Sequence, residues 1–174
     1  MTYLYKAAVA AVASLALMAG ASAASAQSLG FNQAGQNVTA SGQLVQYVNY
    51  PGVIQTVCDV DIYGQVSSNG QNIVFDSYDG AQAPGDNGNL ACSDSLQFPI
   101  TVTASSANEI NLDEFIVGTR GGDCATTNYK LAYSGNTATF NGQYFGALNI
   151  CRASGSLTIT RDSNGAAVNI VTLP

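Results

Sequence analysis

The stretch VCDVDIYGQV, Val57–Val66, alternates between apolar and polar side chains along its length. Successive side chains leave a β-strand on opposite faces, so this period of two predicts a half-buried strand. One face carries Cys58 among β-branched residues, and the other carries Asp59, Asp61 and Tyr63. The stretch therefore indicates a sheet protein with a cysteine in its core and a wet outer face.

The first residues, Met1–Ala26, have the pattern of a secretory signal peptide. Lys6 gives a positive start, an apolar run follows, and Ala24-Ser25-Ala26 fits a signal-peptidase site, with Ala21-Ser22-Ala23 as an alternative cut. The apolar run is too short to span the ~30 Å core of a bilayer, and no second apolar run follows it. We therefore predict that residues 1–26 are removed and that 27–174 form one exported domain without a membrane span.

The mature chain would be acidic but sparsely charged. Removal of 26 of the 174 residues leaves 148, with four basic residues against 11 acidic ones and a formal net charge of −7. This balance excludes binding of nucleic acid through its phosphates and disfavours anionic membrane surfaces. Charged residues make up only 9% of the whole chain, so the surface should be neutral and polar.

All four cysteines lie in the predicted mature chain. An even number in an exported protein indicates two disulfides, for which three connectivities exist. We favour sequential pairing, because each pair then brackets a small group of neighbouring strands. A zinc site is the weaker alternative, since the chain has no C-x-x-C pair and no histidine. The favoured pairs are Cys58 with Cys92 and Cys124 with Cys151.

The rest of the chain predicts about nine short strands and no helix. Regular short strands with Gly and Asn turns are typical of an antiparallel β-sandwich or a Greek-key barrel, which is the fold class that we expect. The last two strands should form a hairpin. The expected strands are Asn37–Ser41, Leu44–Asn49, Val57–Val66, Asn72–Tyr78, Phe98–Ser105, Glu109–Gly118, one with Tyr129, Leu131 and Tyr133 on a shared face, Thr137–Asn141, Ser156–Arg161 and Ala167–Leu173.

Four segments depart from the alternating pattern of a regular strand. Gln27–Gln36 is polar and should be loose, and Asp79–Asp94 should form a long polar loop. Pro99 cannot donate a hydrogen bond to a ladder, which places its strand at a sheet edge. The apolar phase changes around Asp113-Glu114, for which a β-bulge is the simplest cause.

The candidate catalytic groups are few. Without histidine, neither a Ser-His-Asp nor a Cys-His arrangement can form. Paired carboxylates could serve a glycosidase, and the pairs available are Asp59 with Asp61 and Asp113 with Glu114. Adjacent residues of a strand face opposite ways, which disfavours the second pair, and two exposed acids on one face are more often solvated. We therefore predict no catalytic residues and a protein that is not an enzyme.

Two further groups resemble ligand sites in composition. Asp76–Asn89 has the oxygen-rich, glycine-rich composition of a calcium loop, but it lacks an acid at the twelfth position, so a polar turn is the better interpretation. We expect no bound metal and no cofactor. The tyrosines of the mature chain could stack on sugars or apolar molecules, although in β-proteins they usually cover a sheet with their hydroxyls wet. They include Tyr47, Tyr50, Tyr63, Tyr78 and Tyr144.

The order of motifs resembles that of the small exported bacterial proteins known as protein activator of alkane oxidation. The resemblance rests on the signal peptide, VTASG at Val38–Gly42, the Val57–Val66 stretch, FPITVTASSANEI at Phe98–Ile110 and CRASGSLTIT at Cys151–Thr160. The chain departs from that pattern in having Phe98 before Pro99 and no tryptophan. The resemblance implies a non-enzymatic extracellular protein that helps cells to handle hydrophobic substrates or surfaces, as a surface-active or matrix component.

These observations predict an exported protein that acts at or beyond the cell surface, with the periplasm as the other compartment. Its expected partners are hydrophobic surfaces, matrix material or further copies of itself. The rival classes are a subunit of an extracellular filament or adhesin and a carbohydrate-binding module. A filament subunit completed by a neighbour's strand should leave a groove in its own fold and a free apolar terminal strand to fill one.

Overall fold

The structure is a computed structural model that describes residues 27–49, 53–86, 92–93, 95–118 and 123–174. The predicted signal peptide 1–26 and the predicted turn Pro51-Gly52 lie outside the described residues. Within the described ranges, no helix is long and apolar enough to cross a membrane. The strands are β1 Leu29–Phe31, β2 Asn37–Asn49, β3 Val53–Val66, β4 Asn72–Gln82, β5 Ile100–Ser106, β6 Glu109–Val117, β7 Cys124–Ser134, β8 Thr137–Phe145, β9 Cys151–Arg161 and β10 Ile170–Thr172.

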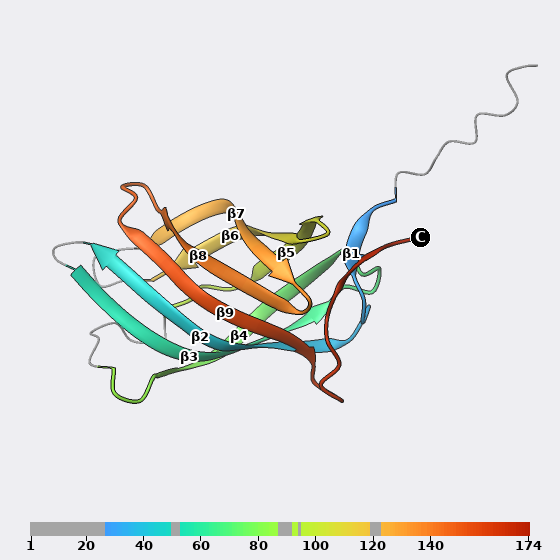
Figure 1. Ribbon diagram of the computed structural model, residues 1–174, viewed down its shortest axis with the longest axis horizontal. Helices are drawn as coiled ribbons and strands as arrows, with labels where there is room; N and C mark the ends of the chain where they lie inside the picture. Colours follow the sequence, from blue (N-terminus) through green and yellow to red (C-terminus); the bar gives the residue numbers. More distant parts are fainter. Residues whose placement is uncertain (1–26, 50–52, 87–91, 94, 119–122) are drawn as a thin grey trace, which may run out of the picture.

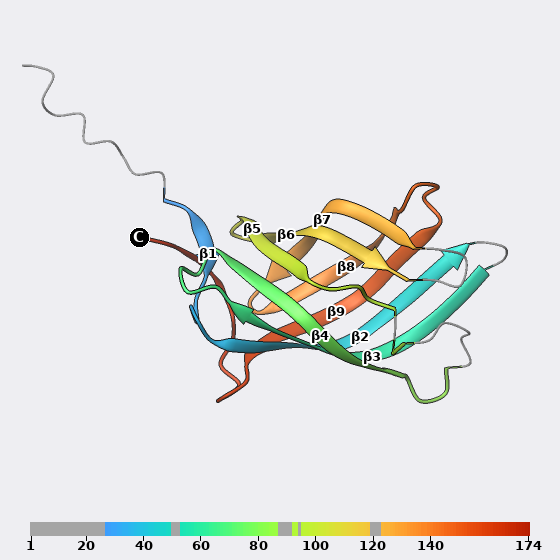
Figure 2. The same cartoon turned by 180° about the vertical axis from the view of Figure 1, so that it is seen from behind.

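Strands β2 to β9 form a closed antiparallel barrel, and β1 and β10 form a separate two-stranded sheet (Figures 1 and 2). The all-β prediction is confirmed. The details differ, because each barrel strand pairs with the next one in sequence and β9 returns to β2. This order is an up-and-down meander, not a Greek key, and the described residues form ten strands instead of about nine.

The Val57–Val66 stretch forms most of β3 and has the predicted faces. Cys58, Val60 and Ile62 are buried, whereas Asp59 and Asp61 are exposed. Strand β3 pairs with β2 along its whole length on one side and with β4 on the other. The alternation thus places one face of the longest strand in the barrel core.

The sequence predicted that Gly42 divides two strands, and this prediction is wrong. Strand β2 continues through it and pairs without interruption with both β3 and β9. A side chain at Gly42 would meet the carbonyl oxygen of Ser156 at 2.2 Å, and one at Gly155 would meet that of Gln43 at 2.1 Å. The two glycines therefore allow β2 and β9 to approach closely where the barrel wall curves.

The barrel wall separates at two places. Strands β4 and β5 pair only over residues 72–75 and 100–103, and β7 and β8 pair only over 132–134 and 137–139. Beyond these pairs the strands diverge, so the wall resembles two sheets joined at corners. The described strands nevertheless close into one barrel, so the sandwich alternative is wrong and the barrel alternative is right only in its closure.

A segment after β4 fills the first separation. Strand β4 runs on to Gln82, so the predicted loop Asp79–Asp94 begins later than expected. The Tyr78 hydroxyl donates to the carbonyl oxygen of Cys92 at 2.6 Å and accepts from the backbone N–H of Ser95 at 2.6 Å. Leu96 then forms a bridge with Val117 of β6. Residues 95–97 therefore extend the line of β5, and Pro99 stands before β5 instead of at a sheet edge.

Aromatic rings close the second separation from the inside. Phe115, Tyr129, Phe140 and Phe145 form a cluster with ring centroids 5.4–6.2 Å apart. The predicted phase change near Asp113 belongs to this region. Burial moves from even to odd positions along β6 between residues 112 and 115. The phase also changes along β7, where Asn128 has a positive φ of 55°. The irregularity therefore affects both strands.

Strands β1 and β10 lie together at one end of the barrel, here called the terminal-strand end (Figure 1). Strand β10 pairs with β1, so the predicted hairpin between Ser156–Arg161 and Ala167–Leu173 is reduced to a single bridge, Thr160 with Ala167. Gln27–Gln36 is not loose throughout, because Phe31 is 1% exposed and its ring contacts that of Tyr133. Burial of Phe31 explains this difference from the prediction.

Candidate functional site

Both disulfides lie toward the opposite end of the barrel, here called the disulfide end. The structure pairs Cys58 with Cys92 and Cys124 with Cys151, which is the sequential pairing that the sequence favours. The first bond holds the segment that fills the β4–β5 separation, and the second joins the start of β7 to the start of β9. Each disulfide thus stabilises the wall beside one separation.

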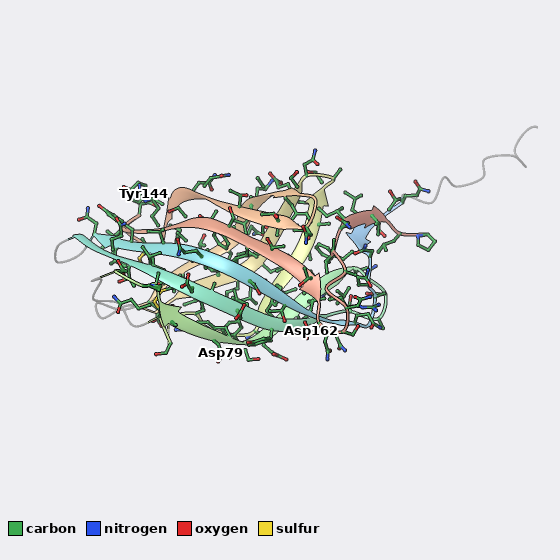
Figure 3. All side chains as sticks on the ribbon, turned by 60° about the horizontal axis from the view of Figure 1, so that its bottom comes forward. Asp79, Tyr144 and Asp162 are labelled. Carbon is green, nitrogen blue, oxygen red and sulfur yellow. A yellow bond between two sulfur atoms is a disulfide. The ribbon has the colours of Figure 1, made fainter. Side chains whose placement is uncertain are left out.

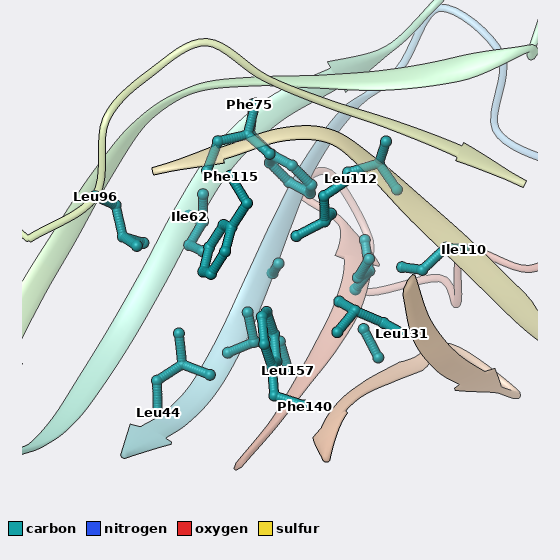
Figure 4. A pocket seen from close by; sticks show the side chains of 15 residues that line it. Leu44, Ile62, Phe75, Leu96, Ile110, Leu112, Phe115, Leu131, Phe140 and Leu157 are labelled. Atoms are coloured by element: carbon teal, nitrogen blue, oxygen red, sulfur yellow. The ribbon is translucent and has the colours of Figure 1, made fainter. Parts of the chain in front are cut away.

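The barrel interior is mainly apolar, and apolar side chains line its remaining cavity (Figure 4). A cavity of about 30 Å³ remains between the inward side chains. A cavity that binds benzene has a volume of roughly 150 Å³, so this one is too small for a hydrocarbon ligand. Any hydrophobic partner must therefore contact the outer surface of this conformation. The lining residues labelled in Figure 4 include Leu44, Ile62, Phe75, Leu96, Phe115 and Leu157.

The predicted pair Asp59 and Asp61 lies on the outer face of β3, with both side chains exposed. Asp61 is directly opposite Asp79 of β4, and Asp59 accepts a hydrogen bond of 3.0 Å from Gln43. The Tyr63 hydroxyl donates to Asp79 at 3.2 Å. Partial loss of hydration raises the pKa of Tyr63, and the hydrogen bond and nearby carboxylates raise it further. These acids border an open surface groove of about 660 Å³.

Asp113 and Glu114, the second predicted pair, are both exposed at the irregularity of β6. Asp113 accepts hydrogen bonds from the Asn111 amide at 3.1 Å and from the Thr103 hydroxyl at 3.4 Å. The Asn111 contact lies within β6, and the Thr103 contact links β6 to β5 at this irregularity. They give Asp113 a role in local structure that needs no substrate.

The calcium-like segment does not form one continuous loop. Asp76–Gly80 belongs to β4, and the carboxylate of Asp86 accepts hydrogen bonds from the Val57 backbone and the Gln82 amide, each at 3.1 Å. Residues 87–89 lie outside the described residues. Within the described ranges, no group of three or more His, Cys, Asp or Glu side chains could hold a metal ion.

The tyrosines do not form a single platform. Tyr78 faces the wall separation and Tyr63 lies beside Asp79, whereas Tyr50 is outside the described residues. Tyr47 and Tyr144 come together on the outer face near the disulfide end, with ring centroids 6.4 Å apart. Among the candidate tyrosines that the structure describes, only this last pair brings two rings together.

A row of three side chains crosses the outer face of β2, β9 and β8. Tyr47 pairs with Arg152 in the β2–β9 ladder, and Arg152 pairs with Tyr144 in the β8–β9 ladder. The Arg152 guanidinium carbon lies 4.6 Å from the centroid of the Tyr47 ring and 5.6 Å from that of Tyr144. Sequence reasoning missed Arg152, because its ring partners lie on other strands and only the final register brings them together.

The disulfide end also exposes apolar side chains. Tyr144 is 52% exposed and Leu148, in the connection between β8 and β9, is 72% exposed. Figure 3 shows Tyr144 near this end, far from Asp162 at the other. Tyr144 and Leu148 are here called the apolar tip. The sequence did not single out Leu148, because an isolated leucine gives no indication of whether its side chain is exposed or buried.

The comparison with protein families places this geometry in a wider context. A family model described as alkane oxidation protein activator PraA/PraB-like matches residues 1–166. No curated protein and no solved structure matches the chain.

Proposed function

The chain belongs to the alkane oxidation protein activator PraA/PraB-like family, and we propose that it is an exported, non-catalytic protein that helps cells to contact hydrophobic substrates. In this proposal it works as a surface-active or matrix component outside the cell. Two disulfides suit an oxidising compartment. The exposure of Tyr144 and Leu148 is the observation that carries the proposal.

The small interior cavity supports contact through the outer surface. Because about 30 Å³ cannot hold a hydrocarbon chain, the alternative of a carrier that encloses its ligand is disfavoured. The apolar tip can instead lie against an apolar phase, and the Tyr144 hydroxyl can remain in water. The sparse charge of the chain reduces the loss of hydration at such a contact.

The filament alternative receives less support from the terminal strands. The N-terminal strand β1 and the C-terminal strand β10 pair with each other inside one chain. Phe31 and Val168 are almost completely buried at this end of the barrel. A terminal strand already used in its own fold is a poor donor to a neighbour.

The apolar tip can be tested at a hexadecane–water interface. We expect the mature protein to lower interfacial tension faster than an equally acidic control protein, and Tyr144→Ser with Leu148→Ser to slow this adsorption. Each substitution removes roughly 1–2 kcal/mol of apolar burial at the oil surface. Tyr63→Ser is the matched control, because Tyr63 is a half-buried tyrosine on another face. Adsorption equal to that of the control protein, or unaffected by the double substitution, would contradict the proposal.

A further inference from the structure

We propose that Arg152, held between Tyr47 and Tyr144, forms a binding site for the carboxylate groups of an acidic, uronate-containing polysaccharide. This site goes beyond the proposed function, because a second ligand class binds to Arg152, although Tyr144 borders both this site and the apolar tip. It also stands if the apolar tip makes no contact with oil.

The charge of Arg152 is not neutralised by any described residue. Among the described residues the guanidinium has no carboxylate within salt-bridge distance and no hydrogen-bond acceptor; its contacts are the two tyrosine rings. Arg161, in contrast, donates to Asn164 at 3.0 Å and to Gln33 at 3.2 Å. Arg152 therefore keeps its N–H donors available, in a chain with few basic residues.

The two tyrosine rings restrict the orientation of the Arg152 guanidinium. A guanidinium stacked on an aromatic face keeps its N–H edge free, and that edge matches the two oxygens of a carboxylate. The two rings lie at 78° to each other, so they restrict the guanidinium from two directions. Holding this side chain in place lowers the entropy lost when a ligand binds.

The side chains beside the row of Tyr47, Arg152 and Tyr144 are neutral. The outward neighbours in the ladders are Gln55, which pairs with Tyr47, and Val45, which pairs with Val57 and Ser154. None of these is charged. Asp59 and Asp61 lie farther along β3, and Asp86 is held by Val57 and Gln82 beyond the β3 edge. An anion can thus approach Arg152 along β2, β9 and β8 in spite of the net negative charge.

The shape of the site favours a polymer over a small molecule. The row lies on the outer face of the sheet, whereas pockets for small ligands enclose most of the ligand surface. The Tyr144 ring is 52% exposed beside the guanidinium and can pack on the C–H face of a sugar ring. One half-buried arginine on an open surface binds weakly, and many copies on one polymer chain would raise the avidity.

Nuclear magnetic resonance titration of the isotope-labelled mature protein tests the site. The probe is a tetragalacturonate, and its methyl ester is the matched uncharged ligand. We expect saturable shifts of the Arg152 Nε–H and of the Tyr47 and Tyr144 rings, with binding at least about tenfold weaker for the ester, since a charge-assisted bidentate pair is lost. Shifts confined to other surfaces, or equal binding of the ester, would overturn the proposal.

Substitutions separate this site from the apolar tip. Arg152→Gln should weaken tetragalacturonate binding by about tenfold, and Arg152→Lys should also weaken it, because lysine lacks the planar fork. Arg161→Gln, which removes the same charge at the other end, and Leu148→Ser should leave binding unchanged. Adsorption to hexadecane should be normal in Arg152→Gln. Equal affinity for laurate or for a sulfated oligosaccharide would overturn the assignment to uronates.

Discussion

At the scale of single residues, Tyr133 links the barrel core to the terminal-strand end. Its side chain is 2% exposed, and its hydroxyl donates to the carbonyl oxygen of Val168 at 2.5 Å. Burial raises the pKa of Tyr133 well above its ordinary value. The folded protein therefore keeps the phenol neutral at a pH where the unfolded chain ionises.

This raised pKa gives a stability change with a defined sign. The contribution of neutral Tyr133 is complete below the unfolded pKa of about 10 and is lost as the pH rises toward the folded pKa, because the unfolded state then binds fewer protons. We expect the free energy of unfolding to fall by up to about 1.4 kcal/mol per pH unit from this group above about pH 10.

Urea denaturation of Tyr133→Phe at neutral and alkaline pH measures this effect. The variant should lose roughly 1–2 kcal/mol at neutral pH, because the Val168 carbonyl loses its donor. It should then lose less stability than the wild type as the pH rises above about 10. Tyr144→Phe, which changes an exposed hydroxyl, is the control and should follow the wild type. The same alkaline slope in Tyr133→Phe and wild type would contradict the assignment.

At the scale of elements, the close pairing of β2 with β9 depends on two glycines. In the β2–β9 ladder, Gly42 pairs with Leu157 and Gly155 pairs with Leu44. The two glycines therefore lie close together, one on each strand. Gly155 has a φ of +133°, which side chains rarely adopt. The contacts of 2.1 and 2.2 Å that a Cβ would make are with backbone carbonyls, which cannot move aside easily.

We expect Gly155→Ala to reduce the free energy of unfolding by roughly 3 kcal/mol or more, from overpacking and backbone strain together. Gly135→Ala is the matched control. Gly135 also has a positive φ, of +61°, but a side chain there would meet nothing within 4 Å. It should cost only about 1–2 kcal/mol, which is the strain alone. Chemical denaturation of both variants checks the difference, and equal losses would show that close strand approach is unimportant.

The same elements show what the sequence can and cannot predict. Local alternation predicted the faces of β3 and the buried row Tyr129, Leu131 and Tyr133, because a strand records its own burial every second residue. It misplaced Gly42, since the consequence of a missing side chain depends on β9. It also missed β1, because the partner of Leu29–Phe31 lies at the other end of the chain.

The same limit applies to the candidate site, because local patterns were predictable and contacts between distant strands were not. Tyr47 and Tyr144 were predicted as candidates, but their meeting at Arg152 depends on the register of three strands. The acids Asp59 and Asp61 of β3 were interpreted as solvated from local alternation alone, and both are exposed. Asp113 and Glu114 were expected to face opposite ways, but both are exposed at the irregularity of β6. The sequential cysteine pairing could be predicted from the sequence, because each bond closes a short stretch of the meander.

At the scale of the whole molecule, the two barrel ends are stabilised by different means. The terminal-strand end is closed by β1 and β10, which contact the core through Phe31. At the disulfide end, β4 and β5 are separate and the segment with Leu96 covers the interior. That segment is held by Cys92 and by the Tyr78 hydroxyl.

The two disulfides should therefore differ in what they protect. Their loops have sequence separations of 34 and 27 residues, so removal of either should cost a similar amount, about 3–4 kcal/mol in the chain-entropy model. Only Cys58→Ala with Cys92→Ala loosens the cover that carries Leu96. Removal of the Cys124–Cys151 bond leaves the interlocked rings of Phe115 and Phe140 across the other separation.

Binding of an apolar fluorescent dye under native conditions distinguishes these outcomes. The wild-type cavity of about 30 Å³ is too small for such a dye, and the variant without Cys124 and Cys151 should also bind little of it. The variant without Cys58 and Cys92 should bind the dye while its far-ultraviolet circular dichroism remains that of the folded barrel, because its interior becomes accessible. Equal dye binding by both variants, at equal measured stability, would show that general loosening, and not the Leu96 cover, controls access to the core.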